Sequence, residues 1–185
     1  MAHRIEVGLK KGMRDPLGER MKKRIQNDLG LSIKSVRTIS VFTLDVDLSR
    51  EELEAVASGP FLDLIIQEYS IDGSLAQDFD WLVEVGFRPG VTDNVGKTAR
   101  EAIQWRLGKQ LEENERVYTS IQYLLRGVLK REAVERICTD LLANPLIHRF
   151  DIRSRKDWSG KIEPSVPRVI GIGGAKVEQI DSWAA

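Results

Sequence analysis

The residues with the clearest chemical signature are Gly96-Lys97-Thr98, because a glycine, a lysine and a hydroxyl residue at a helix start can bind phosphate. A phosphate-binding loop needs four residues between its two glycines, so that successive N–H groups surround the phosphate. Here five residues, 91–95, separate Gly90 from Gly96. Asp93 would also place a carboxylate where the phosphate charge should lie. The spacing therefore favours a turn and a capped helix, and it counts against a small nucleotide hydrolase.

The other candidates for catalysis or metal binding have no evident partners in the sequence. Asp45 and Asp47 would point to one side of a strand, but no third ligand lies at a spacing typical of a metal site. His3 and His148 have no evident partner for general-base chemistry. Cys138 falls on the apolar face of a predicted helix, where a thiol behaves as a small hydrophobe. We therefore predict no catalytic, cofactor-binding or metal-binding residue in this chain.

A run of basic residues is the one asymmetry of charge. It comprises Arg20, Lys22, Lys23 and Arg24 on the solvent side of a predicted helix, with Lys10, Lys11 and Arg14 shortly before them. Such a surface can hold an acidic partner or RNA. That helix has no aromatic residue on which a base could stack, and 28 Lys and Arg balance 28 Asp and Glu in the whole chain. We predict no nucleic-acid partner.

The composition is that of an ordinary globular protein. Apolar residues form 42% of the 185 positions, which is enough for a hydrophobic core. A single cysteine excludes an internal disulfide and fits a reducing compartment. No apolar run approaches the roughly 20 residues of a membrane span, and the N-terminus lacks the apolar core of a signal peptide. We expect a cytoplasmic location and no membrane contact.

An internal repeat organises the chain. Residues 5–30 and 83–108 share ten identities over twenty-six positions without a gap. If three residues are inserted after Gly108, the repeat continues to residues 71 and 152, so each unit has about 70 residues. A unit of that size buries a marginal core alone, whereas two packed units bury more. We interpret residue types shared by both copies as structural.

Each unit should begin with a strand followed by a helix. Asp15 and Asp93 stand at helix N-cap positions, with Pro16 at a first helical position. Gly30 and Gly108 supply the helix ends. The core-facing residues are Ile5, Val7 and Leu9, repeated as Val83, Val85 and Phe87, in the strands, and Leu17, Met21, Ile25 and Leu29, repeated as Val95, Ala99, Ile103 and Leu107, in the helices.

The second part of each unit predicts further strands and one helix. Residues 35–47 and 116–127 are rich in strand formers and long enough for a strand pair or one long bent strand. Ser49 and Glu52 form a capping box for a helix over 50–58. Its counterpart over 131–143 turns five apolar residues inward: Val134, Ile137, Cys138, Leu141 and Leu142. Closing strands are predicted at 65–71 and 146–152.

The predicted fold class is therefore α+β. The order β-α-β-β-α-β occurs twice, which is the ferredoxin-like pattern of antiparallel sheets with helices on one face. The first unit spans residues 1–78 and the second spans 79–153. The pattern stops at residues 154–185, which we predict to be a linker or tail, and the Gly-Ile-Gly-Gly segment at 171–174 lacks the strand–helix setting of a nucleotide site.

Several segments resemble the PurS-like units of formylglycinamidine ribonucleotide (FGAM) synthase. Residues 79–99, FDWLVEVGFRPGVTDNVGKTA, are similar to the second PurS-like repeat in the N-terminal part of the fused enzymes. Residues 7–21, VGLKKGMRDPLGERM, resemble the opening of the separate PurS subunit, and residues 141–147, LLANPLI, resemble the end of the family's second helix. Residues 177–181, VEQID, look like the linker that precedes the synthetase domain. The resemblance covers residues 4–153.

The resemblance implies a role in purine biosynthesis. The family's enzyme converts formylglycinamide ribonucleotide (FGAR), glutamine and ATP to FGAM, and ammonia passes from a glutaminase part to a synthetase part. PurS-like units carry neither active site; they occur as dimers or fused pairs and bridge the other parts. The implied role is a non-catalytic component of this ligase whose partners are the synthetase and the glutaminase, with ATP and Mg²⁺ in the synthetase. A homo-oligomer is compatible with that role.

On this hypothesis we expect partner contacts at the loops Lys10–Arg14 and Arg88–Thr92, which follow equivalent strands, and at the linker. The sequence leaves open whether the chain is a fragment of a longer enzyme or a free-standing fused pair. The alternative hypothesis is a tandem ACT-like regulatory domain, which shares the β-α-β-β-α-β order and binds small ligands at a pair interface. Gly12 and Gly90 at the strand-to-helix turns suit that alternative too.

Overall fold

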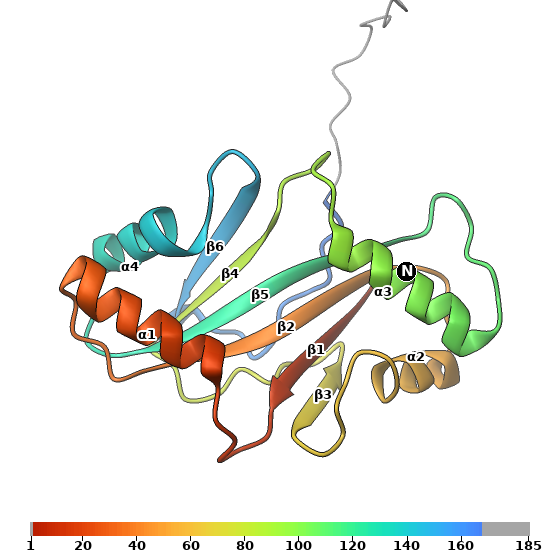
Figure 1. Ribbon diagram of the computed structural model, residues 1–185, viewed down its shortest axis with the longest axis horizontal. Coiled ribbons are helices and arrows are strands. Elements are labelled where there is room, and N and C mark those ends of the chain that lie inside the picture. Colours follow the sequence, from red (N-terminus) through yellow and green to blue (C-terminus); the bar gives the residue numbers. More distant parts are fainter. Residues whose placement is uncertain (1, 168–185) are drawn as a thin grey trace, which may run out of the picture.

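The computed structural model describes residues 2–167 (Figure 1). The predicted features at 171–174 and 177–181 lie outside the described residues, as does most of the predicted tail. Within the described part, no helix is long and apolar enough to cross a bilayer.

Each repeat contributes three strands and two helices in the order β-α-β-α-β. The first unit contains β1 (His3–Leu9), α1 (Pro16–Leu29), β2 (Ser35–Asp45), α2 (Arg50–Ala57) and β3 (Gln67–Ile71). The second contains β4 (Trp81–Phe87), α3 (Asn94–Leu107), β5 (Arg116–Arg126), α4 (Arg131–Ile137) with a following π-helical turn (Cys138–Leu142), and β6 (His148–Ser154), after which a 3-10 turn (Arg155–Asp157) ends the regular structure of the described residues.

The predicted α+β class with antiparallel strands is confirmed, but the ferredoxin-like order with four strands in each unit is wrong. Residues 35–45 form one strand of 11 residues, and so do residues 116–126. Neither strand contains a glycine or proline at which the chain could reverse. The six strands build one sheet instead of two, because these two long strands pair with each other.

The strand order is β3-β1-β2-β5-β4-β6, and every neighbouring pair is antiparallel (Figure 1). β2 and β5 pair over their whole length, from Ser35 opposite Arg126 to Asp45 opposite Arg116. At the midpoint Ser40 faces Ile121, and these two positions are equivalent in the repeat, 81 residues apart. A pseudo-twofold axis therefore passes between them and relates the two halves of the sheet.

All four helices cover one face of the sheet, and each half of the helical layer mixes the two units. One core cluster joins α1 of the first unit to α4 of the second through residues such as Ile25 and Val134. The other joins α2 of the first unit to α3 of the second through Val56 and Ile103. Neither unit alone contains a complete core. The 70-residue repeat is therefore half of a domain, in agreement with its small size.

The opposite face is partly covered by irregular chain. A third cluster packs Ile39, Val41, Leu82 and Leu124 of the sheet against Ala76 and Phe79 of the segment that connects β3 to β4. Trp158 meets the Phe79 ring edge-on, with centroids 5.5 Å apart. The start of the predicted tail is thus fixed against the sheet.

Most predicted boundaries agree with the structure to within a few residues, but the closing strands begin later than predicted. Residues 65–66 and 146–147 are in turns, and the strands start at Gln67 and His148. Asp63 and Asn144 open these turns by accepting backbone N–H bonds two residues ahead.

Candidate functional site

Two equivalent aspartates fasten the first helix of each unit to a central strand. Asp15 accepts the N–H of Gly18 at 2.8 Å and the N–H of Thr38 at 2.6 Å. Asp93 accepts the N–H of Gly96 at 2.7 Å and that of Thr119 at 2.6 Å. The predicted N-caps are confirmed. The bonds to the central strands were not predicted, although the recurrence of Asp and Thr in both copies carries that signal.

The glycine three residues after each aspartate lets the helix backbone touch that strand. A Cβ atom at Gly18 would lie 2.3 Å from the carbonyl oxygen of Val36, and one at Gly96 would lie 2.3 Å from that of Val117. Only glycine fits there. The prediction that Val95 faces the core is wrong, since its side chain is 59% exposed. The backbone at Gly96 fills the place that a side chain at position 95 was expected to fill.

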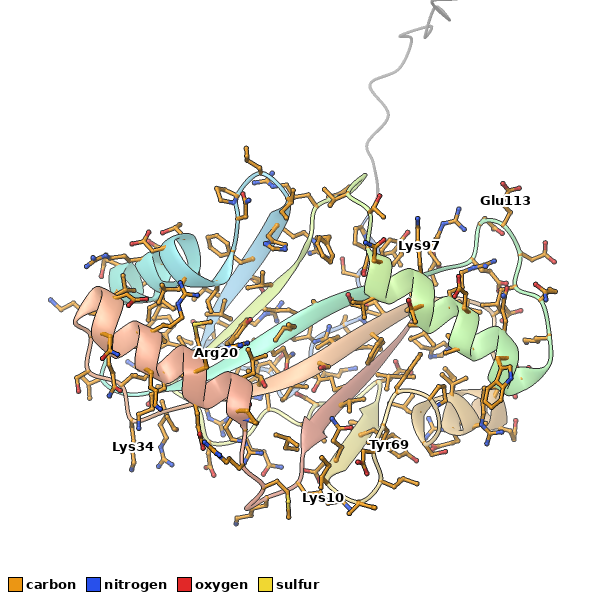
Figure 2. The ribbon with its side chains drawn as sticks, in the orientation of Figure 1. Lys10, Arg20, Lys34, Tyr69, Lys97 and Glu113 are labelled. Carbon is orange, nitrogen blue, oxygen red and sulfur yellow. The ribbon has the colours of Figure 1, made fainter. Side chains whose placement is uncertain are left out.

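This geometry removes the phosphate-site interpretation of Gly96-Lys97-Thr98. The carboxylate of Asp93 already accepts the N–H of Gly96, and the Thr98 hydroxyl donates to the carbonyl of Asn94 within the helix. Figure 2 shows Lys97 on the first turns of α3. A phosphate at this helix start would meet a carboxylate instead of free N–H groups.

The other candidate residues lie on separate elements. Asp45 ends β2, whereas the backbone of Asp47 donates to Glu115. The His3 ring lies 2.8 Å from Asp72, and His148 accepts the N–H of Asn144. Each histidine ring therefore has a hydrogen-bond partner that the sequence did not indicate. Among residues 2–167, no three His, Cys, Asp or Glu side chains are grouped so that they could hold a metal ion.

Cys138 lies in the core cluster beneath α1 and α4. Burial, assisted by the charge of Glu135, raises the pKa of its thiol to about 12. A thiol with that pKa is almost wholly protonated at neutral pH, so it is a poor nucleophile. Its interpretation as a buried small hydrophobe agrees with this environment.

A buried ionic network crosses the pseudo-twofold axis on the face opposite the helices. Arg4 is 2% exposed; its Nε donates to Glu6 at 3.0 Å, and its two terminal nitrogens donate to Glu84 at 3.1 and 2.7 Å. The Gln122 amide bonds both carboxylates, at 3.1 Å to Glu6 and 3.3 Å to Glu84. Glu6 and Glu84 are equivalent in the repeat, so one arginine from the first unit serves both copies.

The network holds its charges against strong desolvation. Burial would raise the pKa of Glu84, but hydrogen bonds and charge from Arg4, with bonds from Ser120 and Gln122, outweigh it and lower the pKa below its ordinary value. Burial likewise opposes the charge of Arg4, and the two glutamates reverse this and raise its pKa. This network was not predicted from the sequence. The sequence feature that could have indicated it is the glutamate at both equivalent positions, 6 and 84. The arginine at position 4 is not repeated, because the equivalent residue is Leu82.

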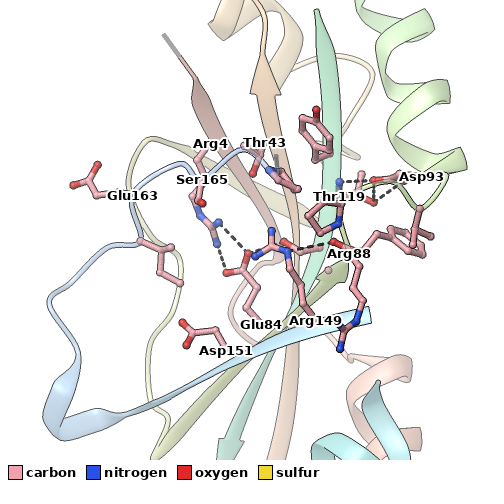
Figure 3. A pocket seen from close by; sticks show the side chains of 18 of the residues that line it. Arg4, Thr43, Glu84, Arg88, Asp93, Thr119, Arg149, Asp151, Glu163 and Ser165 are labelled. Carbon is pink, nitrogen blue, oxygen red and sulfur yellow. Dashed lines mark hydrogen bonds and ion pairs between the residues drawn. The ribbon is translucent and has the colours of Figure 1, made fainter. Parts of the chain in front are cut away.

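Above the network lies a cavity of about 730 Å³ (Figure 3). Arg4 and Glu84 belong to its lining, together with the loop after β4, the β6 residues Arg149, Asp151 and Arg153, and the segment 159–167. Much of its charge is paired internally, as in Arg153 with Asp151 at 2.7 Å and Lys161 with Glu163 at 2.6 Å. The described lining has no histidine or cysteine. The Ser120 hydroxyl of the lining donates to Glu84 at 2.6 Å and so belongs to the same network.

The two loops expected to contact partners are equivalent turns at opposite sides of the sheet (Figure 1). The N–H of Met13 donates to Lys10 at 3.0 Å, and that of Val91 donates to Arg88 at 3.1 Å. Their glycines, Gly12 and Gly90, have φ of 87° and 85°, as turns of this kind require. Only the second loop borders the cavity.

Comparison with known proteins agrees with the repeat. The family model described as PurS, phosphoribosylformylglycinamidine (FGAM) synthase, matches residues 2–74 and again residues 81–156. The two matches cover most of the chain, and each contains one β-α-β-α-β unit. No curated protein matches the chain.

Proposed function

Because the chain belongs to the PurS family of FGAM synthase, we propose that it is a non-catalytic component of that ligase which bridges the synthetase and glutaminase parts. FGAR, glutamine and ATP are then converted to FGAM by the assembled enzyme, and the present chain keeps the two active sites in position for ammonia transfer.

The observation that carries the proposal is the single sheet built from two family matches. Each matched segment supplies half of both helix-covered cores, so the pair folds as one body. The pseudo-twofold axis between Ser40 and Ile121 presents two equivalent loops, 10–14 and 88–92, on opposite sides. A rigid body with two separated, equivalent surfaces can engage a partner at two points and hold it in a fixed orientation.

The placement of ATP and Mg²⁺ in the synthetase is part of the same proposal. It is supported by the carboxylates of Asp15 and Asp93, which occupy the helix starts where a phosphate would otherwise bind. It is supported also by the cavity lining, where the carboxylates of Glu84, Asp151 and Glu163 pair with basic residues and that of Asp93 accepts backbone N–H groups.

Reconstitution tests the bridging role. The purified chain is added to a synthetase and a glutaminase that lack a PurS component, and FGAM formation is measured with glutamine and, separately, with ammonium salt. We expect the chain to increase the rate of FGAM formation from glutamine. The rate of FGAM formation from ammonium salt should change much less. A glutamine-dependent rate that stays flat over a range of chain concentrations would contradict the bridging role.

The ACT-like alternative has less structural support. It requires four strands in each unit, and the structure has three in each unit of one continuous sheet. We therefore do not pursue it.

A further inference from the structure

We propose that two exposed aliphatic turns, residues 63–66 and 144–147, are paired anchors that insert into two apolar pockets of one FGAM synthase component, each pocket edged by carboxylates. This inference rests on the proposed function and names the surface that carries it. The two segments are called the aliphatic turns below.

The aliphatic turns expose large side chains in both repeats. Ile65 and Leu146 occupy equivalent positions and are each 82% exposed. Their neighbours Leu64, Ile66 and Ile147 are exposed as well. Single exposed aliphatic residues are common, but consecutive ones at equivalent places in two copies form patches of the kind found at protein interfaces.

The backbone of the two turns is fixed by the same hydrogen bonds. Asp63 accepts the N–H of Ile65 at 2.9 Å, and Asn144 accepts that of Leu146 at 3.0 Å. In return, the N–H of Asp63 donates to the Gln67 side chain at 2.8 Å, and the N–H of Asn144 donates to the His148 ring at 3.0 Å. Different side chains thus build one geometry in both copies.

Each turn is also tied to the loop that follows the neighbouring strand. The backbone N–H of Lys10 donates to Ile66 at 2.9 Å, and that of Arg88 donates to Ile147 at 2.9 Å. The Lys10 ammonium also donates to the carbonyls of Leu64 and Ile65, and Figure 2 shows it where β1 ends and β3 begins. Arg88 Nε donates to the carbonyl of His148 at 3.0 Å. A turn held so firmly loses little conformational entropy on binding.

Charge around the turns indicates the nature of the occupant. The adjoining loops 10–14 and 88–92 carry only basic side chains: Lys10, Lys11 and Arg14 in the first, where Arg14 pairs with Glu19 at 2.7 Å, and Arg88 in the second. The one carboxylate in the turns themselves, that of Asp63, accepts the N–H of Ile65. A pocket that receives an aliphatic turn beside these cations needs an apolar floor and an acidic edge. The cavity above the ionic network is lined mainly by charged and polar residues, so it does not complement the turns of a second copy.

The test uses the full chain with matched controls. Ile65→Lys, Leu146→Lys and the double variant are titrated by calorimetry into the purified synthetase and, separately, into the purified glutaminase. The controls are Val128→Lys and Trp105→Lys, which alter exposed apolar residues whose counterparts in the other repeat are polar, Asp47 and Asn27. We expect each single anchor variant to weaken binding to one component at least about tenfold and the double variant to abolish it, with controls and melting temperatures near wild type.

Three results would overturn the inference. If the chain binds a component and the anchor variants bind it as tightly as the controls do, the anchors are wrong and the bridging role stands. If the wild-type chain binds neither component, both the anchors and the bridging role fail. If sedimentation shows wild-type chains associating with one another and the anchor variants not, the turns are contacts between copies.

Discussion

The two halves of the sheet are alike at their helix starts and unlike at the axis between them. Asp15, Gly18 and Thr38 are repeated as Asp93, Gly96 and Thr119, with matching contacts. At the axis, Glu6 is repeated as Glu84, but Arg4 is matched by Leu82. The residues repeated at the helix starts are those that set the backbone of each unit.

The difference shows what covalent fusion permits. In a symmetric pair of identical units, every cation beside the axis would occur twice. Here a single guanidinium pairs with both symmetry-related carboxylates, and the Gln122 amide bonds to both as well. The two units have therefore become complementary at their shared interface, and neither is interchangeable with the other.

The largest expected effect comes from removing the asymmetric cation. Arg4→Leu, which copies the residue of the second unit, leaves two buried carboxylates near each other without a cation. We expect a loss of about 3–5 kcal/mol in the free energy of unfolding at pH 7, measured by urea denaturation. The variant that also carries Glu6→Gln and Glu84→Gln should regain much of it. A loss below about 1 kcal/mol would mean that the network contributes little to the pairing of the halves.

The difference in stability between the wild type and Arg4→Leu should depend on pH in a defined direction. Because Arg4 lowers the pKa of Glu84 in the folded wild type, this group contributes stability above its unfolded pKa, and the contribution is lost as pH falls through the folded value. Without Arg4, burial raises the pKa of Glu84, so protonation at low pH relieves the variant. The stability difference between wild type and Arg4→Leu should shrink between pH 7 and pH 4.5. A difference that widens with acidification would contradict the assignment.

A smaller effect tests the likeness of the helix starts. Gly18→Ala and Gly96→Ala each force a Cβ against a strand carbonyl, and we expect both to cost about 3 kcal/mol in thermal or urea unfolding. Gly12→Ala and Gly90→Ala are controls for the effect of backbone conformation. Alanine is strained at the positive φ of these positions, but nothing lies within 4 Å of the added Cβ at Gly12. These should cost about 1–2 kcal/mol. Unequal losses at positions 18 and 96 would show that the halves differ there.

The smallest effect concerns a helix cap present in one half. Ser49 and Glu52 form a capping box at α2, whereas Lys130 caps α4 without a side-chain bond. Ser49→Ala should cost about 1 kcal/mol, and Lys130→Ser should gain a few tenths to 1 kcal/mol. Melting temperatures of the two variants would check this opposite pair of shifts. A loss at position 130 would indicate that Lys130 has another structural role.

Local features followed from the sequence because their causes are local. The Asp–Pro start of α1, the Gly30 end and the capping box at Ser49 each depend on residues within one or two turns of chain. At the exposed aliphatic turns the sequence predicts the starts of strands, since Ile65 and Ile66 favour strands. The turn is instead imposed by hydrogen bonds of the Asp63 and Gln67 side chains. The spacing of apolar residues in the sequence does not indicate these bonds.

Taken alone, the sequence determined a duplicated α+β unit, because a repeat and its helix caps depend on local residue order, and its resemblance to PurS-like units indicated the family. The tertiary structure decided that β2 and β5 pair across a pseudo-twofold axis, that α1 shares a core with α4, and that Arg4 bridges Glu6 and Glu84. The strand pair, the helix pair and the Arg4–Glu84 ion pair each join residues of different units. Their partners are selected by sheet register and burial, which exist only once the chain has folded.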